Sequence, residues 1–314
     1  MAQVLAVTNM KGGVGKSSTV ICLADTLAAR GKGPILVVDV DTQASSSYCL
    51  AGDACLTELI EGGKTIDQFI GRRLVEGEAL PLEHFVRRQV SNTTVARKGV
   101  LDISLVASST NLRLSERNVL HQLTQRGLSM TGIEECLTKL LGNELASVGR
   151  EFGYIIFDCA PGISPLTTAA ISCANLVVVP TIPDFISFLG LDAFLHSVRR
   201  DMTNRAAHRP PQVLITRSVA RARHGWASLW SATGGRRVRT NTHKEFEERI
   251  RELARAHPSE MGVFRTTLDE TPVVPVAMAM GALPEHSPTY QQKYPSPLNR
   301  VLERLTTEIE EVLQ

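Results

Sequence analysis

A glycine-rich segment near the N-terminus constrains the fold of this chain more than any other feature. It reads NMKGGVGKSST over residues 9–19. An apolar, strand-like run at residues 3–8 precedes it, and residues 16–30 show helical spacing that Gly31 closes. Where a strand passes through such a loop into a helix, backbone N–H groups and the positive end of the helix face one anion. The sequence therefore predicts a phosphate-binding loop on an α/β scaffold.

The loop departs from the ordinary phosphate-loop spacing at one position. Counted back from Gly15 and Lys16, the pattern G-x-x-x-x-G-K-[ST] places glycine at position 10. The chain has Met10 there, and it adds a second lysine, Lys11, directly before the glycines. A glycine-rich turn without a ligand is the plain alternative, but the strand before the loop and the helix after it favour phosphate binding.

The residues of this loop are expected to contribute both backbone and side-chain groups to a bound nucleotide. The glycines allow a tight turn in which successive N–H groups point at one phosphate. Lys16 would reach the β- and γ-phosphates, Ser17 would offer its hydroxyl to Mg²⁺, and Ser18 would donate to the α-phosphate. The predicted nucleotide contacts are Lys11, Gly12, Gly13, Val14, Gly15, Lys16, Ser17 and Ser18.

Apolar, β-branched runs alternate with helix-like segments along most of the chain. The run ILVVDVD at residues 35–41 is near-continuously hydrophobic, which indicates a strand buried on both faces of a parallel sheet. Alternating strands and helices favour a doubly wound, mostly parallel α/β sheet flanked by helices. The further predicted strands lie at residues 101–107, 154–158, 175–181, 212–216 and 262–264.

We predict a single domain over residues 1–314. The length allows one large α/β domain or two small ones, and the chain contains no internal repeat, low-complexity tract or clear linker. Two stretches, at about residues 61–100 and 217–243, are rich in charge or loop formers and are expected to be insertions. A hydrophobic content of 43% predicts a packed core, while the formal charge of +2 does not by itself indicate a nucleic-acid partner.

Three aspartates are expected at the carboxyl ends of strands, where doubly wound sheets bind their ligands. Asp158 follows YIIF and has the form of a carboxylate that holds Mg²⁺, usually through water, although an Asp at a strand end is often only a turn residue. Asp39 and Asp41 flank Val40 and would point to the same face of a strand. We assign Asp41 to the attacking water and Asp39 to the metal side. The predicted metal ligands are Ser17, Asp39 and Asp158.

These motifs resemble the deviant Walker family of P-loop ATPases. KGGVGKSS, VVDVDTQ and IIFDCAPG are similar to the motifs of ParA-type partition ATPases, MinD-type positioning ATPases and the nitrogenase iron protein. The resemblance implies ATP and Mg²⁺ as cofactors, and an ATP-bound sandwich homodimer in which Lys11 crosses the interface to the partner's phosphates. A cation supplied in trans is worth about 10³ to 10⁵ in rate where an arginine plays this part. The resemblance implies Lys11, Lys16 and Asp41 as the catalytic residues.

The resemblance extends over most of the chain. LDISLVASSTNLRLSE at residues 101–116 and NLVVVPTIPDFISFLGL at residues 175–191 are similar to ParA segments. Two departures stand out. The chain has Thr42-Gln43 where the family often has Pro-Gln, and the family's late isoleucine-proline is not recognisable in RTTLDETPVVPVAMAMG at residues 265–281. The residues that contact adenine are therefore not assigned.

Six scattered cysteines argue against the iron–sulfur member of this family. They form no C-x-x-C pair, and the short spacing from Cys159 to Cys173 does not resemble the cluster-ligating arrangement of the iron protein. We expect six buried structural thiols in a reduced, cytosolic chain. The six are Cys22, Cys49, Cys55, Cys136, Cys159 and Cys173.

The final segment, LNRVLERLTTEIEEVLQ, distinguishes ParA-like from MinD-like function. A MinD-like ATPase is expected to end in a basic membrane-binding helix, whereas Glu308, Glu310 and Glu311 would be repelled by anionic lipid. No apolar run approaches the roughly 18 residues of a membrane span, and no signal-peptide pattern is present, so we expect a cytoplasmic protein without direct membrane binding. A MinD-like membrane-cycling ATPase is the alternative. We expect this helix to pack on the domain through Leu298, Val301, Leu302, Leu305, Ile309 and Val312.

A basic set between residues 199 and 244 points to DNA. A charge run is usually a solvated surface, but few acidic residues interrupt this one, and the resemblance implies nonspecific binding to nucleoid DNA through the C-terminal half. Trp226 and Trp230 within the set are expected to be core rather than base-stacking residues. The predicted DNA-binding residues are Arg199, Arg200, Arg217, Arg221, Arg223, Arg236, Arg237 and Arg239, and the set also holds Arg205, Arg209 and Lys244.

The resemblance thus implies a cycle. The ATPase dimerises on ATP, binds the nucleoid, and is released after a slow hydrolysis that a ParB-like partner stimulates. Its cargo is expected to be a plasmid, a chromosome or a protein assembly.

Overall fold

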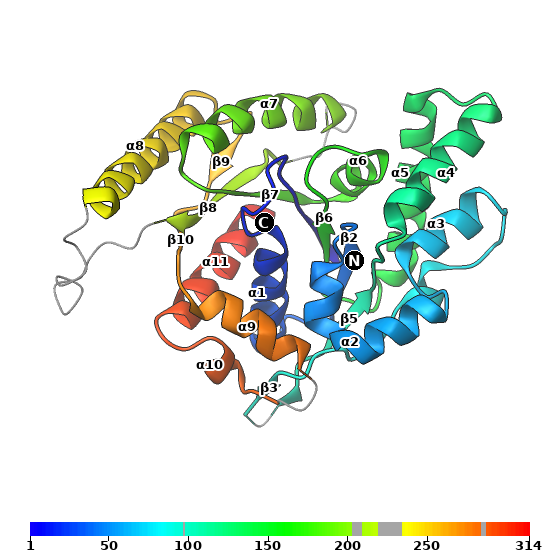
Figure 1. Ribbon diagram of the computed structural model, residues 1–314, viewed down its shortest axis with the longest axis horizontal. Coiled ribbons are helices and arrows are strands. Elements are labelled where there is room, and N and C mark those ends of the chain that lie inside the picture. Colours follow the sequence, from blue (N-terminus) through cyan, green and yellow to red (C-terminus); the bar gives the residue numbers. More distant parts are fainter. Residues whose placement is uncertain (97, 203–208, 219–233, 284–286) are drawn as a thin grey trace.

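The computed structural model describes residues 1–96, 98–202, 209–218, 234–283 and 287–314 (Figure 1). Its central feature is an eight-stranded sheet in the order β10-β8-β7-β1-β6-β2-β5, with β9 beside β8. The pairings between these described strands are parallel. The strands are β1 (Gln3–Val7), β2 (Ile35–Val40), β5 (Ile103–Val106), β6 (Tyr154–Cys159), β7 (Leu176–Thr181), β8 (Gln212–Ser218), β9 (Gly262–Val263) and β10 (Leu268–Asp269).

Helices cover both faces of this sheet (Figure 1). The second of them is bent, because Gly52 has φ +70° and ψ 172° and separates two helical segments. The helices are α1 (Lys16–Ala29), α2 (Ser45–Glu61), α3 (Ile66–Leu74), α4 (Leu112–Gln125), α5 (Met130–Val148), α6 (Pro165–Cys173), α7 (Phe185–Met202), α8 (Gly234–Ala256), α9 (Val273–Ala282), α10 (Tyr290–Lys293) and α11 (Leu298–Leu313).

The two hydrophobic cores follow from the alternation of side chains along each strand. Val4 and Ala6 of β1 belong to the core that α5, α6 and α7 cover. Leu5 and Val7, which point the other way, belong to the core that α1 and α11 cover. A parallel sheet buried on both faces explains the near-continuous apolar runs in the sequence. The predicted doubly wound, mostly parallel sheet is confirmed.

The region at residues 61–100, which was expected to be an insertion, contributes side chains to the core. It contains α3, a 3₁₀ turn (Leu82–Phe85) and the antiparallel pair β3 (Thr94–Val95) and β4 (Gly99–Val100). Phe69 and Phe85 are fully buried, and their rings meet edge to face with centroids 5.4 Å apart. The division into one domain with two insertions stays a prediction.

Much of the predicted DNA-binding set lies outside the described residues. This applies to Arg205, Arg221, Arg223, Trp226 and Trp230, and to the side chains of Arg199, Arg200, Arg236, Arg237 and Arg239. Within the set, the structure describes the side chains of Arg209, Arg217 and Lys244. Arg209 donates to the carbonyl of Leu313, and Lys244 is exposed on α8.

The predicted packing of the last helix is confirmed. Leu302, Leu305 and Ile309 of α11 are fully buried, and α11 lies against α1 (Figure 1). Arg30, which caps α1, forms an ion pair of 2.8 Å with Glu310. The apolar stripe of α11 therefore faces the core of the domain.

Two further sequence expectations concern cysteines and membranes. Cys22 and Cys159 are buried as expected, but the expectation is wrong for Cys49, Cys55, Cys136 and Cys173, whose helices leave them partly exposed. No helix in the described part of the chain combines the length and the apolar character that a membrane crossing requires.

Candidate functional site

The register of the sheet brings the predicted site residues together at the carboxyl ends of its central strands. β6 lies between β1 and β2, and Asp158 pairs with Val7 on one side and with Asp39 on the other. All three strands run in the same direction, so the loop after β1 and the carboxylates of β2 and β6 meet at their carboxyl ends. The predicted convergence of the loop with Asp39, Asp41 and Asp158 is observed.

The glycine loop forms an open cradle in front of α1. Gly13 and Gly15 have φ of +73° and +89°, a conformation that residues with a Cβ rarely adopt. A Cβ built at Gly12, Gly13 or Gly15 would meet no atom within 4 Å, so the backbone borders free space. α1 starts at Lys16 without a side-chain cap or an acidic residue in its first turn. Its first N–H groups are therefore available to an anion.

The cradle opens into a cavity of about 340 Å³. Lys16, Ser17 and Ser18 line this cavity from the loop side, and Asp41 lines it from the end of β2. Met278 of α9 and Cys49 of α2 form its far wall. Lys16 is only 6% exposed, and its Nζ donates to the carbonyl of Lys11 at 3.2 Å.

Burial disfavours the charged form of Lys16, and the carboxylates around it offset only part of this effect. Burial lowers the pKa of the Lys16 ammonium, whereas Asp158 and Asp41 act to raise it. Lys16 lines the cavity into which the cradle opens, and a phosphate bound there would further stabilise its charged form.

Asp158 is fully buried at the end of β6. Its Oδ2 accepts a hydrogen bond from the Ser46 hydroxyl, and its Oδ1 has no hydrogen-bond partner among the described residues. Burial raises the pKa of Asp158, while the hydroxyls of Ser46 and Ser17 act in the opposite direction. An unsatisfied buried carboxylate oxygen beside Ser17 suits a divalent cation, because Mg²⁺ prefers oxygen ligands. The residues present thus fit the implied metal.

Asp39 is held by hydrogen bonds from the residues that follow β2. Its carboxylate accepts hydrogen bonds from the Ser47 N–H and hydroxyl at 2.9 and 2.7 Å and from the Asp41 N–H at 3.0 Å. Burial, and secondly the charge of Asp158, raise the pKa of Asp39. Asp39 therefore holds the start of α2 against β2. Its assignment to the metal remains a prediction.

The two lysines of the loop occupy separate environments. Lys11 Nζ lies 3.0 Å from Asp184 Oδ2 and 2.9 Å from the Ser187 hydroxyl, at the start of α7. Burial acts to raise the pKa of Asp184, but hydrogen bonds from the Ser187 N–H and from Lys11 outweigh it and lower the pKa. The side chains of Lys11 and Asp184 are 34% and 32% exposed. Lys16 faces the cavity, whereas Lys11 lies at the surface beside it.

Arg217 lies at the loop as well, although the sequence placed it in the DNA-binding set. Its guanidinium donates to the Gly13 carbonyl at 3.2 Å and forms an ion pair of 3.1 Å with Glu270. The adjacent Thr216 donates its hydroxyl to the Val14 carbonyl at 2.8 Å. The end of β8 thus contacts the loop, and Thr216 and Arg217 line a second cavity there.

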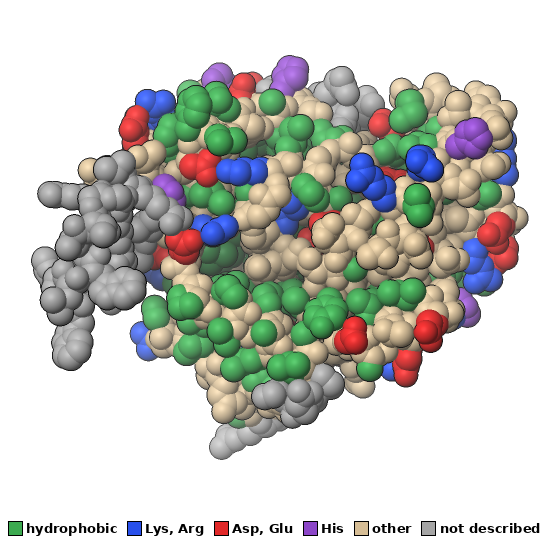
Figure 2. Space-filling model, in the orientation of Figure 1, with side chains coloured by type: hydrophobic (Ala, Val, Ile, Leu, Met, Phe, Trp, Pro, Cys, Tyr) green, Lys and Arg blue, Asp and Glu red, His purple; other side chains and the backbone are tan. Residues whose placement is uncertain are grey.

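A second cavity, of about 590 Å³, adjoins the other end of the loop. Ser18 and Thr19 line it on the α1 side, and Pro272, Val274 and Pro275 form an apolar wall. This wall begins the apolar helix α9, whose Val276 is 52% exposed, and apolar side chains gather over this part of the surface in Figure 2. The segment at residues 265–281, in which no adenine-contacting residue was assigned, therefore borders the site.

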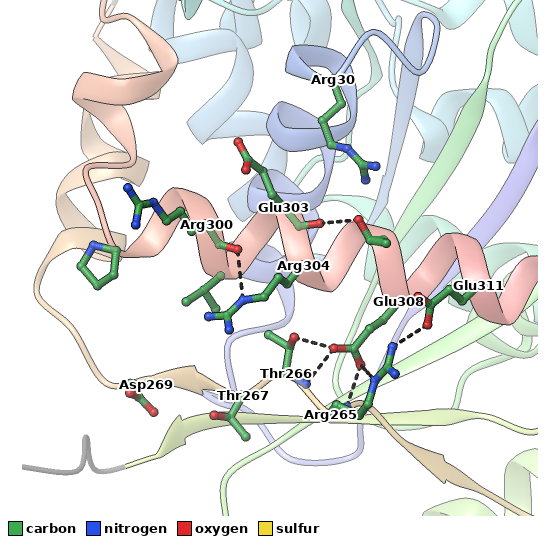
Figure 3. Close-up of a pocket in the computed structure, with 13 residues that line it drawn as sticks. Arg30, Arg265, Thr266, Thr267, Asp269, Arg300, Glu303, Arg304, Glu308 and Glu311 are labelled. Carbon is green, nitrogen blue, oxygen red and sulfur yellow. Dashed lines mark hydrogen bonds and ion pairs between the residues drawn. The ribbon is translucent and has the colours of Figure 1, made fainter.

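A larger cavity, of about 1330 Å³, lies between α11 and residues 265–269, and no residue of the glycine loop lines it (Figure 3). The charged residues of this cavity form ion pairs and hydrogen bonds with neighbouring residues. Arg265 pairs with Glu311, and Glu308 accepts hydrogen bonds from the Thr266 N–H and hydroxyl at 3.1 and 2.6 Å. These contacts fasten the chain after β9 to α11, and this cavity is not part of the candidate site.

Several residues of the site were not predicted from the sequence. Ser46 and Ser47 lie in α2, which follows the second aspartate; Ser46 contacts Asp158 of β6 and Ser47 contacts Asp39 of β2. Asp184 and Thr216 had a positional signal, because each lies at or just beyond the carboxyl end of a predicted strand. That signal alone does not distinguish a site residue from a turn residue.

Comparison with known proteins identifies relatives for most of the chain. A family profile described as an AAA domain matches residues 2–207. The sporulation initiation inhibitor protein Soj of Bacillus subtilis is 27% identical over 205 residues, which make up 63% of this chain and 66% of Soj. The match thus spans slightly less than two thirds of that relative's length.

Two solved structures share the fold over nearly the full length. Apo McdA of Cyanothece gives a TM-score of 0.63 at 17% identity and covers 100% of both chains. A putative plasmid partition protein of Borrelia burgdorferi bound to AMPPNP gives 0.57 at 18% identity and covers 98% of this chain and 100% of its own. At such identities the likeness shows the fold alone.

Proposed function

The chain belongs to the AAA domain family and is a ParA/MinD-type P-loop ATPase, and we propose that it binds and hydrolyses ATP with Mg²⁺ at residues 11–18. It works in a partition or positioning system. The open cradle before α1, the buried Lys16 and the carboxylates at the sheet edge support this proposal, and the Borrelia burgdorferi relative in fold carries an ATP analogue.

The nucleotide is oriented by the two cavities along the loop. Lys16 and Ser17 line the smaller cavity with Asp41, so the γ-phosphate end lies there. Ser18 and Thr19 line the larger adjoining cavity, so the α-phosphate and the base lie on that side. The apolar wall at residues 272–275 then faces the base.

Ser17 and Asp158 are the residues best placed to hold Mg²⁺. The Ser17 hydroxyl and the Asp158 oxygen that has no hydrogen-bond partner among the described residues would supply hard oxygen ligands, and a bound ion would offset the negative charge of the phosphates. Asp39 supports this side of the site indirectly, because it fixes Ser47 and the backbone of Asp41.

Asp41 orients the attacking water. Its carboxylate lines the cavity beside Lys16, and the Gln43 N–H donates to its Oδ1 at 2.9 Å. This hydrogen bond fixes the side chain and leaves the second oxygen to accept a hydrogen bond from water. A carboxylate in this place aligns the nucleophile with the γ-phosphate.

The separation of the two lysines carries the proposal of a dimer. Lys16 already supplies the local cation, whereas Lys11 is held at the surface by Asp184 and Ser187, away from the cavity of its own chain. We assign Lys11 to the phosphates of a second copy that faces the loop. ATP then joins two copies, and hydrolysis is slow until a ParB-like partner completes the arrangement.

The ATP-bound dimer binds nonspecific DNA through the basic set at residues 199–239. Two weak DNA-binding surfaces joined in one dimer act with the avidity of a linked pair, so ATP controls attachment to the nucleoid. The cargo is a plasmid, a chromosome or a protein assembly. The chromosome partitioning protein ParA of Caulobacter vibrioides, 26% identical over 198 residues, and the plasmid partition protein that shares the fold support this class of role.

MinD-like membrane cycling has less support. The apolar stripe of α11 is buried against the domain and is not available to lipid in this arrangement. A DNA shift assay beside liposome co-sedimentation separates the two roles.

The nucleotide proposal is tested by ATP binding and phosphate release. Lys16→Ala should weaken ATP binding by about 10- to 100-fold, because a charge-assisted hydrogen bond is lost. Lys139→Ala, at an exposed position on α5, is the control and should bind as the wild type does. Wild-type protein that neither binds nor hydrolyses ATP would exclude the function.

A further inference from the structure

Two consecutive residues at the end of β8 each hold one carbonyl of the glycine loop. The Thr216 hydroxyl donates to the carbonyl of Val14 at 2.8 Å, and Arg217 Nη1 donates to the carbonyl of Gly13 at 3.2 Å. Thr216 is buried, and the second arm of Arg217 is held by Glu270 at 3.1 Å. These contacts span about 200 residues of sequence, and neither belongs to the sheet ladder.

The direction of the loop N–H groups follows from these contacts. In a trans peptide the carbonyl of one residue and the N–H of the next point in opposite directions, because the unit is planar. A carbonyl of Gly13 turned toward Arg217 therefore turns the N–H of Val14 away from it. The carbonyl of Val14 turned toward Thr216 does the same for the N–H of Gly15.

These two N–H groups are left for a ligand. No acceptor for the N–H of Val14 or of Gly15 is found within the described ranges of the chain. A Cβ at Gly13 or Gly15 would also meet no atom within 4 Å, so the turn borders open space. Successive unbonded N–H groups in a turn of this kind form an anion-binding concavity.

Arg217 is the unpaired residue at a β-bulge, because Thr216 pairs with Leu268 and Ser218 pairs with the next residue, Asp269. Arg217 has φ +51°, in the left-handed region that a residue with a side chain rarely occupies. Such conformations persist where the surrounding contacts fix them, and they concentrate at functional sites. The left-handed turn occurs at the residue whose guanidinium reaches both Gly13 and Glu270.

We propose that Thr216 and Arg217 are positioning residues that set the phosphate-binding loop in its ligand-ready form before nucleotide arrives. They hold two successive carbonyls from the side of the 590 Å³ cavity, which both residues line, so that the N–H groups of Val14 and Gly15 point away from them and toward the phosphates. Arg217 acts here on the nucleotide site and not on DNA. The inference rests on the proposed binding of ATP at this loop.

The test compares ATP with inorganic tripolyphosphate, which has the phosphates and lacks the base. Thr216→Val keeps the size and removes the hydroxyl, and Arg217→Ala removes the guanidinium. Each should weaken the binding of both ligands by about five-fold, which corresponds to one hydrogen bond. The effect should be equal for both ligands because the loop contacts only phosphate. Thr307→Val and Arg249→Ala are matched controls on α11 and α8, and Arg249 is 50% exposed like Arg217.

Two further measurements separate positioning from general stability and from charge. Arg217→Gly relieves the left-handed backbone, so its melting temperature should equal or exceed that of the wild type while its tripolyphosphate affinity still falls. In the nucleotide-free protein, the amide NMR signals of Val14 and Gly15 should move in Thr216→Val and stay in Thr307→Val.

The outcomes distinguish the inference from the function on which it rests. If the wild type binds ATP and Thr216→Val binds both ligands equally well, the positioning role is refuted. If Arg217→Ala weakens ATP and leaves tripolyphosphate unchanged, Arg217 contacts the base side and the inference is also wrong. A wild type that binds neither ligand would remove the proposed function itself.

Discussion

Lys11 and Asp184 form an ion pair of 3.0 Å that joins the glycine loop to the start of α7. The Ser187 hydroxyl completes the contact at 2.9 Å from the same ammonium. In a dimer in which Lys11 reaches the second copy, this contact must open. In the proposed dimer, the ion pair would therefore have to break in each chain, and it would oppose dimerisation.

Loss of this pair should favour the dimer. Asp184→Asn leaves the side chain in place and removes its charge, and a pair about one third exposed is worth at most about 1 kcal/mol. The ATP-dependent dimer should then form at up to about five-fold lower protein concentration, as measured by analytical ultracentrifugation. Asp192→Asn, at an exposed position on the same helix, should leave the concentration unchanged. A dimer weakened by Asp184→Asn would show that Asp184 acts in the interface instead.

Lys11→Ala should separate binding from catalysis. Lys16 remains to hold the phosphates, so ATP affinity should stay within a few-fold of the wild type, while partner-stimulated phosphate release should be lost by about 10³-fold or more. Isothermal titration and a phosphate-release assay measure the two properties. Normal stimulated turnover in this variant would overturn the role of Lys11.

A buried ion pair ties α10 to the helix that follows the loop. Lys293 Nζ lies 2.7 Å from Asp25 Oδ2, both side chains are at most 1% exposed, and the Tyr294 hydroxyl donates to the same carboxylate at 2.7 Å. Lys293→Met should lower the free energy of unfolding by about 3–5 kcal/mol, because Asp25 stays buried without its cation. Urea denaturation measures the change.

A double variant checks the cause of that loss. Asp25→Leu combined with Lys293→Met removes both charges and should recover most of the stability, since apolar pairs often replace buried ion pairs at little cost. A loss below about 1 kcal/mol in Lys293→Met alone would contradict the account of a buried uncompensated charge.

Charge reversal in the basic set should weaken DNA binding through salt-dependent contacts. For the ATP-bound protein, Arg236→Glu with Arg237→Glu should lower affinity at low salt and reduce the log–log salt slope by about two, close to 0.9 per lost phosphate contact. Arg113→Glu with Arg117→Glu, at exposed positions on α4, is the control. Undiminished binding of the first variant would remove these arginines from the DNA-binding surface.

The sequence was sufficient for the sheet and for the loop because both depend on local pattern. The apolar run at residues 35–41 contains β2, and the helix predicted at residues 16–30 extends from Lys16 to Ala29, with Gly31 in the left-handed conformation just beyond it. The central strands are buried on both faces, so their hydrophobicity is nearly continuous and easy to recognise.

The contacts around the loop could not be obtained in this way. Asp39 and Asp41 stand two residues apart and were expected to share a face, but β2 ends at Val40 and the chain turns there. Asp39 then meets Ser47, and Asp41 lines the cavity. Thr216 and Arg217 reach the loop from a strand about 200 residues away, a contact that arises from sheet order and has no local pattern.

The oligomeric state in the presence of nucleotide shows whether ATP joins two copies of this chain. Sedimentation or light scattering should be run on the wild type and on Asp41→Ala, each with Mg²⁺ and either ATP or ADP. The single chain has a mass of 34.2 kDa. We predict twice this mass for Asp41→Ala with ATP, since the variant binds nucleotide and fails to hydrolyse it, and the single-chain mass with ADP. A single-chain mass with ATP for both proteins would contradict the dimer.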